Sequence, residues 1–267
     1  MNYKYILPGL MLLFIGCSVS ENLSIPQRNP TAITGSEFYK KVLTASREDR
    51  EKLAMTEILK GNIPSFLKKF VRIDVTINSN SKIIKAHYFV LPDYLSIGID
   101  DDFARIPLTP MTAQAIADSL HCFLPTRKMV NDIYINAKVK LEPVPLLSFR
   151  DSALMFWQHH LMIEGERKQR KGLIAGIKKD VVISSQIRQD PKPNRVAIFG
   201  WHKPDGLPIQ PLYTGHVNWY VDYSHGIRLI WRTIYVDGKA MDYIDVLKDP
   251  ELKSLLCDEE ACDYYRY

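Results

Sequence analysis

The sequence predicts an α+β fold, and three observations support that prediction. The N-terminal half shows helical spacing of apolar residues, and one β-hairpin pattern interrupts it. The C-terminal half is a series of short runs rich in β-branched and aromatic residues. Turn sequences with proline, glycine and aspartate separate these runs. We therefore expect helices and a hairpin first, and then a mainly antiparallel sheet.

Size and charge define the broad class of the protein. The chain has 267 residues, of which 46% are hydrophobic and 24% charged, as is ordinary for a globular protein. It carries 35 Lys and Arg against 30 Asp and Glu, a net charge of +5. This excess suits contact with anionic envelope polymers. It is too diffuse to indicate nucleic-acid binding, which requires a clustered basic stripe.

The N-terminal segment 1–17 reads as a lipoprotein signal peptide. Lys4 supplies a positive start, an apolar run follows over 6–15, and Gly16-Cys17 closes it. The run is too short to cross a bilayer as a helix. Its end resembles the bacterial lipobox, although Phe14 stands where that motif usually has leucine. The resemblance implies that Cys17 is lipidated and becomes the first residue of the mature protein; an ordinary signal peptide with an incidental cysteine is the alternative.

The expected elements follow in chain order. Residues 18–35 are polar, and we expect a flexible tether there. Helices are predicted over 36–70 with Ser36 and Ser46 as N-caps, a hairpin over 71–91, and then loop and short strand. Two more helices should follow Thr109 or Thr112 and Thr126, and a long one should cover 151–171. One domain is expected over 36–267, with a possible subdivision near 143–148.

The C-terminal half should form the sheet. Strand patterns occupy the runs GLIAGI, DVVISSQI, RVAIFGWH, HVNWYVDY and GIRLIWRTIYV, and short helices over MDYIDVL and DPELKSLL should close the chain. An oxidising compartment would permit a Cys257–Cys262 bridge. Cys122 is better explained as a buried structural thiol than as a nucleophile.

The stretch HVNWYVDYSHGIRLIW, residues 216–231, is the strongest candidate for a functional surface. On a strand its odd positions would be apolar apart from His225, and its even positions would carry polar groups that can bind ligands or transfer protons. We expect the chain to break at Ser224-His225-Gly226 and to expose His225 beside Asp222. A continuous strand with a satisfied core histidine is the alternative.

A local resemblance to a known family lies in the same place. Ser224-His225-Gly226-Ile227-Arg228 resembles the Ser-His-Gly-Cys-x-Arg motif of the L,D-transpeptidases, which are envelope enzymes with a β-rich domain. The family's upstream histidine would correspond to His202. The nucleophilic cysteine is missing between Gly226 and Ile227, so the resemblance implies no transpeptidase activity.

Two kinds of chemistry remain open for this stretch. His202, His216, Asp222 and His225 could hold zinc with an open position for water. Alternatively, His225 could carry a proton without a metal while Asp222 orients it. Ser224 as nucleophile is the third possibility, although no G-x-S-x-G sequence surrounds it. Side chains that could contact an anionic or sugar substrate are Arg228, Tyr220, Trp201, Lys178 and Arg127.

Together these features predict an exported, lipid-anchored envelope protein. We expect a hydrolase or transferase that acts on a glycan or peptidoglycan-type substrate through the histidines and Asp222. A non-catalytic lipoprotein that binds glycan or another envelope protein is the alternative. The positions of His202, His216, Asp222 and His225 discriminate between the two hypotheses. The enzyme is favoured if at least two of them converge within hydrogen-bond reach in a cleft, and it is opposed if their side chains diverge into core and solvent.

Overall fold

The computed structural model describes residues 22–267, and it is α+β, as the sequence predicts. Cys17 and the rest of the predicted signal peptide lie outside the described residues. The helices are α1 (Gly35–Val42), α2 (Arg47–Leu59), α3 (Pro110–Ser119), α4 (Arg127–Asn136), α5 (Ala153–Arg167), α6 (Gln186–Gln189) and α7 (Tyr243–Lys248), with two 3₁₀ turns, η1 (Ser65–Lys68) and η2 (Lys253–Leu255). Within residues 22–267, none of the helices is both long and apolar enough to cross a membrane.

The strands form two larger sheets and two short pairs. The first half contributes β1 (Val71–Ser79), β2 (Lys82–Val90), β3 (Ser96–Ile99), β4 (Asp102–Arg105), β5 (Cys122–Phe123) and β6 (Val139–Lys140). The second half contributes β7 (Ile174–Ala175), β8 (Lys179–Val182), β9 (Arg195–His202), β10 (Pro208–Val217), β11 (His225–Gly226), β12 (Ile230–Trp231), β13 (Thr233–Val236) and β14 (Lys239–Asp242).

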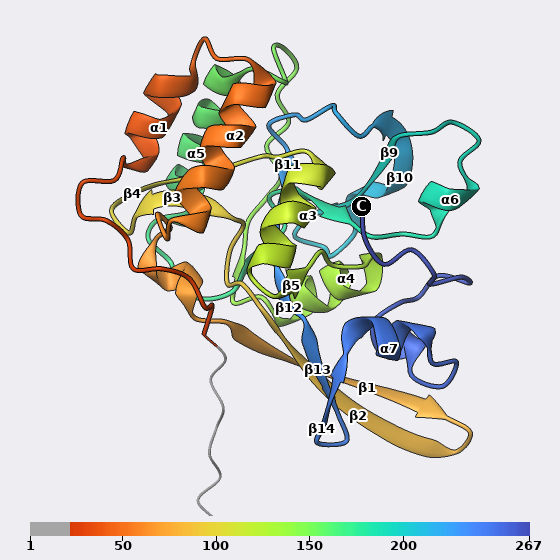
Figure 1. The fold of residues 1–267 in the computed structure, drawn as a ribbon. Coiled ribbons are helices and arrows are strands. Elements are labelled where there is room, and N and C mark those ends of the chain that lie inside the picture. Colours follow the sequence, from red (N-terminus) through yellow and green to blue (C-terminus); the bar gives the residue numbers. More distant parts are fainter. Residues whose placement is uncertain (1–21) are drawn as a thin grey trace, which may run out of the picture.

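Most strands of the second half belong to two larger sheets, and the first of these also contains β1, β2 and β5. One has the order β14-β13-β2-β12-β5, with β1 paired to β2, and the other has the order β10-β9-β8-β11. Pairing is mainly antiparallel, but β11 runs parallel to β8 and β6 parallel to β7. The β1–β2 hairpin projects from the body, whereas β9 and β10 lie on the opposite side of α3 and α4 (Figure 1).

Local sequence explains most helix starts. Thr34, rather than the predicted Ser36, caps α1 with a capping box to Glu37. Ser46, Thr109 and Thr126 cap the next three long helices as predicted. These caps set the start of each helix that lies against the sheets.

The segment 22–34 differs from the predicted flexible tether. Leu23 is buried and its N–H donates to the Lys68 carbonyl. Arg28 donates to the side chain of Asn62. These contacts hold the segment against the domain, so it cannot act as a free spacer.

β10 was not predicted from the sequence, for a physical reason. It contains Pro208 and Pro211, and the run KPDGLP over 203–208 reads as a turn. β10 is an edge strand with alternating exposure, and an edge is where a sheet tolerates proline. The largest core cluster draws on both halves of the chain, from Leu23 to Cys257. The Cys257–Cys262 disulfide is present and Cys122 is buried, as expected.

Candidate functional site

The stretch 216–231 is neither one continuous strand nor two strands that meet at Ser224. β10 ends at Val217, and residues 218–224 form a looping segment before β11 pairs with β8. Backbone hydrogen bonds fix this segment: Tyr223 N–H donates to the Arg150 carbonyl and His225 N–H to the Asp222 carbonyl. The loop folds back on the end of β10, and it brings His216 close to His225 with ring centroids 6.3 Å apart.

Asp222 is the centre of the resulting group of residues, which we call the Asp222 cluster. Its members are Arg150, Lys179, His216, Tyr220, Asp222, Ser224 and His225. Asp222 is fully buried and accepts hydrogen bonds from Arg150 Nη2 at 2.7 Å and from Ser224 N at 2.8 Å and Oγ at 2.5 Å. Burial alone would raise its pKa, but His225, Ser224 and Lys179 together hold it well below the ordinary value. The carboxylate is therefore ionised at neutral pH.

His225 is buried rather than exposed, which corrects the predicted position. Its side chain is 1% exposed, and Nε2 lies 3.9 Å from Asp222 Oδ1 without a hydrogen bond to any described residue. That distance exceeds hydrogen-bond range. Burial lowers the pKa of His225 to about 4, so the imidazole is neutral at neutral pH. A neutral, unpaired ring beside a carboxylate can accept a proton.

Three members of the cluster lie between the buried pair and solvent. His216 and Tyr220 are half-buried, and Arg150 keeps 39% of its side chain exposed. The His216 and Tyr220 rings lie 4.7 Å apart, and Tyr220 lies 6.1 Å from His225. A substrate would therefore meet Arg150, His216 and Tyr220 first.

The sequence offered Lys178 or Lys179 as a contact for an anionic substrate, and the structure places Lys179 at the cluster. Lys179 pairs across the sheet with His225, and its ammonium lies 4.8 Å from the ring centroid of Trp201. Lys178 points the other way: its Nζ donates to the Tyr223 carbonyl and lies 3.2 Å from Nδ1 of His159, fully buried. Alternation along a strand separates the two lysines, and only the strand assignment could have shown which one faces Asp222.

Other predicted site residues lie elsewhere or have structural partners. His202 stacks on Tyr134 at 4.4 Å, and its Nε2 lies 2.9 Å from Asn131 Oδ1. Arg127 pairs with Asp258 near the C-terminus. Trp201 is buried and reaches the cluster only through Lys179.

The four residues proposed for zinc do not form one ligand set, because His202 is directed to Asn131. In the part of the chain that the structure describes, 22–267, no three His, Cys, Asp or Glu side chains could hold a metal together. Ser224 Oγ donates to Asp222 and not to a histidine, so the geometry of an activated serine is absent there.

Arg228 is buried and has structural partners near the Asp222 cluster, so it does not face a substrate. Its guanidinium donates to the carbonyls of Leu91 at 3.0 Å and Ile174 at 2.7 Å. It lies 3.8 Å from Asp180, which also accepts from the Tyr94 hydroxyl. Burial raises the pKa of Asp180 to about 7. These contacts fix β8, and through it the position of β11.

Gly226 permits this close packing by having no side chain. A Cβ there would lie 2.6 Å from the Tyr94 ring and 2.8 Å from Lys178 Cβ. We expect Gly226→Ala to cost about 1–3 kcal/mol of unfolding free energy, as overpacking does, measured by urea denaturation. Gly165→Ala is the control, because nothing lies within 4 Å of its added Cβ on α5. That variant should be neutral or stabilising, and equal losses in both would contradict the packing argument.

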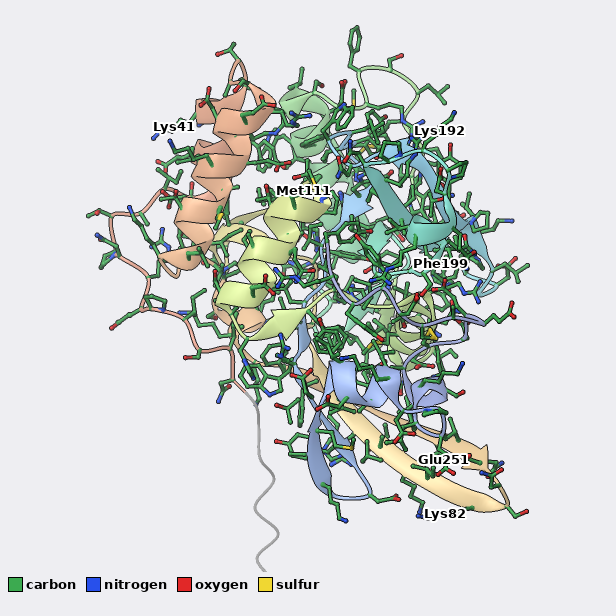
Figure 2. All side chains as sticks on the ribbon, turned by 45° about the vertical axis from the view of Figure 1, so that its right-hand side comes forward. Lys41, Lys82, Met111, Lys192, Phe199 and Glu251 are labelled. Atoms are coloured by element: carbon green, nitrogen blue, oxygen red, sulfur yellow. A yellow bond between two sulfur atoms is a disulfide. The ribbon has the colours of Figure 1, made fainter. Side chains whose placement is uncertain are left out.

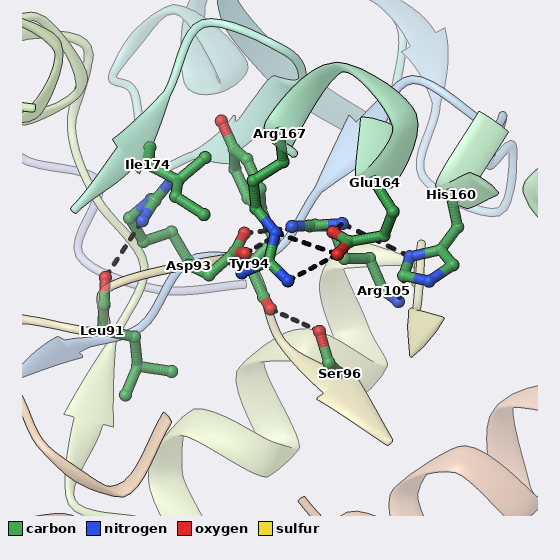
Figure 3. A network of polar contacts seen from close by, with 10 residues as sticks. Leu91, Asp93, Tyr94, Ser96, Arg105, His160, Glu164, Arg167 and Ile174 are labelled. Atoms are coloured by element: carbon green, nitrogen blue, oxygen red, sulfur yellow. Dashed lines mark hydrogen bonds and ion pairs between the residues drawn. The ribbon is translucent and has the colours of Figure 1, made fainter. Parts of the chain in front are cut away.

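A large cavity lies away from the Asp222 cluster. It measures about 1270 Å³ and is lined by parts of 65–71, 92–103 and 157–174, with Lys138. Figure 3 shows a polar network beside it, in which buried Arg105 lies between two lining residues, Asp93 and Glu164. His160 and Glu164, four residues apart on α5, both contact Arg105. We call this cavity the α5 groove.

Comparisons with known proteins add no relative. No family model, curated protein or solved structure matches the chain.

Proposed function

We propose that this protein is an exported, lipid-anchored envelope enzyme, a hydrolase or transferase that acts on a glycan or peptidoglycan-type substrate. The observation that supports it is that His216, Asp222 and His225 approach one another from one strand end, one loop and a second strand. The approach stops short of a hydrogen bond, since His225 Nε2 lies 3.9 Å from Asp222 Oδ1. Buried acid–base pairs of this kind are costly to the fold and are concentrated at functional sites.

Each member of the pair has a distinct role in this proposal. His225 accepts the proton of the attacking water or hydroxyl and returns it to the leaving group. Asp222 stabilises the imidazolium that forms, because its carboxylate remains ionised and lies 3.9 Å from Nε2. Arg150 and Tyr220 contact the substrate at the exposed side of the cluster.

The export proposal rests on two features of the chain. The disulfide between Cys257 and Cys262 is typical of proteins outside the cytoplasm. Gly16-Cys17 after the apolar run supports lipid attachment. Cys17→Ala is expected to release the protein from membranes or block its maturation, measured by fractionation of cells; unchanged membrane partition of a processed variant would oppose the anchor.

Activity is tested on insoluble envelope polymer prepared from bacterial cells. Purified protein is incubated with it, and soluble reducing ends report glycosidic cleavage while new amino groups report amide cleavage. His225→Gln should lower product formation by about 10²–10⁴-fold, the usual contribution of a general acid or base. His87→Gln is the control, since His87 stacks on Tyr235 away from the cluster. Both variants are assayed under conditions in which circular dichroism shows that they are folded. Equal rates of product formation by His225→Gln and His87→Gln would defeat the proposal.

A non-catalytic binding function is the second candidate. The observation that favours it is that the α5 groove, the large cavity described above, shares no lining residue with the Asp222 cluster. If the protein co-sediments with the polymer and releases no product, the binding function replaces the enzymatic one.

A further inference from the structure

The α5 groove is too large for an ion and has apolar walls. Its volume of about 1270 Å³ exceeds the range of about 300–1,000 Å³ common for small-molecule sites. Phe66, Phe70, Leu161 and Ile174 supply apolar surface. An extended ligand with apolar groups fits such walls.

Charges of both signs line the rim, and several lack partners. Lys69, Lys138, Lys168 and Lys171 are exposed lining residues, and none of their ammonium groups forms an ion pair within residues 22–267. Asp101, on the β3–β4 turn, is likewise exposed without an ion pair in that range. Asp100 beside it accepts from Ser65 but has no cationic partner there. The groove thus offers cations and carboxylates that form no ion pair within residues 22–267.

The basic side of the rim is held in an unusual backbone conformation. Lys168 and Gln169 have φ of 48° and 60°, two successive non-glycine residues in the left-handed region. Such residues cost free energy and are concentrated at functional sites. Gly172, with φ of 122°, lets the Lys138 side chain approach the same turn, since an added Cβ would lie 3.3 Å from it. The turn presents Lys168 and Lys171 to the groove, and Lys138, from the segment between α4 and β6, lies beside it.

Two aromatic rings of the groove, Trp157 and Phe103, are already engaged by protein groups. Trp157 stacks on His160 with centroids 5.3 Å apart and lies 5.5 Å from Tyr39. Phe103 has the guanidinium groups of Arg105 and Arg167 at 5.3 and 5.4 Å from its centroid. Protein groups therefore occupy part of the Trp157 and Phe103 ring surfaces on which a sugar would stack.

From the apolar walls, the charges of both signs and the occupied rings, we infer that the α5 groove binds a short peptide with free ends. Its carboxylate contacts Lys168 and Lys171, and its ammonium contacts Asp100 and Asp101. This site is separate from the Asp222 cluster and does not depend on the proposed chemistry. The enzyme could fail its activity test while the groove still binds peptide.

Binding is tested with the full chain and a defined pool of tripeptides with free ends, using saturation-transfer NMR. The same pool, acetylated and amidated, is the blocked probe. The free pool should bind, and Lys168→Ala/Lys171→Ala should weaken the best member at least about tenfold, as loss of a charge-assisted contact does. Lys82→Ala/Lys239→Ala is the matched control; Lys82 lies at the end of the β1–β2 hairpin (Figure 2). It should leave the Kd unchanged.

Any of the following outcomes overturns the inference. The first is that the free pool does not bind. The second is that free and blocked pools bind equally, or that the groove variant matches the control. The third is that trigalacturonic acid, an anionic sugar probe, displaces the best peptide from wild type and loses affinity in the groove variant, which would make the site a glycan site.

Discussion

Replacing Arg105 with alanine is expected to reduce the free energy of unfolding by about 3–5 kcal/mol, the cost of removing one partner from a buried ion pair. Arg105 is 1% exposed and donates to Asp93 from Nε at 3.0 Å and from Nη2 at 2.5 Å. Its Nη1 reaches Glu164 at 2.7 Å. Alanine would leave the buried Asp93 carboxylate without a cation.

Equilibrium urea unfolding measures this loss, and Arg72→Ala is the control. Arg72 also binds an aspartate, Asp74, but 54% of its side chain is exposed. Exposed pairs contribute at most about 1 kcal/mol, so this variant should be close to wild type. Arg105→Lys should be intermediate, because lysine keeps the charge but cannot make the paired contact. A smaller loss of unfolding free energy in Arg105→Ala than in Arg72→Ala would contradict the structural role of Arg105.

Replacing Asp222 with alanine is expected to have a similarly large effect, about 3–5 kcal/mol. The change leaves Arg150 and the buried Lys179 without their anionic neighbour, and it removes the acceptor of the Ser224 N–H. Since the folded-state pKa of Asp222 lies below its ordinary 3.8, its stabilisation is present above that pH and is lost as pH falls further.

Urea unfolding at a series of pH values checks the Asp222 prediction. The difference between wild type and Asp222→Ala should be largest near neutral pH and should shrink below about pH 4. Asp101→Ala, an exposed carboxylate without an ion pair in the described chain, is the control and should show no such difference. A constant difference across the acid range would contradict the assignment of an ionised Asp222.

Local signals explain why much of the fold was predictable. The hairpin over 71–91 alternates in sequence, and β1 and β2 pair in register from Val71↔Val90 to Ser79↔Lys82. Ser46, Thr109 and Thr126 precede apolar periodic segments and cap helices there. These features depend on neighbours in sequence, so periodicity and residue type were sufficient.

Features that depend on distant contacts were not predictable. Polar and apolar residues alternate over 218–224 as they would in a strand. The Tyr223 hydroxyl, however, hydrogen-bonds the Leu146 backbone and the Tyr223 N–H donates to the Arg150 carbonyl, and these contacts impose a loop. Burial of His225 follows from the parallel pairing of β11 with β8. The α5 groove is assembled from segments as far apart as 65 and 174, and no spacing in the sequence reports it.

The pH dependence of the initial rate on envelope polymer tests the central claim most directly, which is that His225 is a neutral, buried proton acceptor beside Asp222. Burial lowers the pKa of His225 to about 4, so the rate should be constant at mildly acidic pH and fall only near pH 4. A rate that already falls near the ordinary histidine value of 6.5, or no rate at any pH, would contradict the claim.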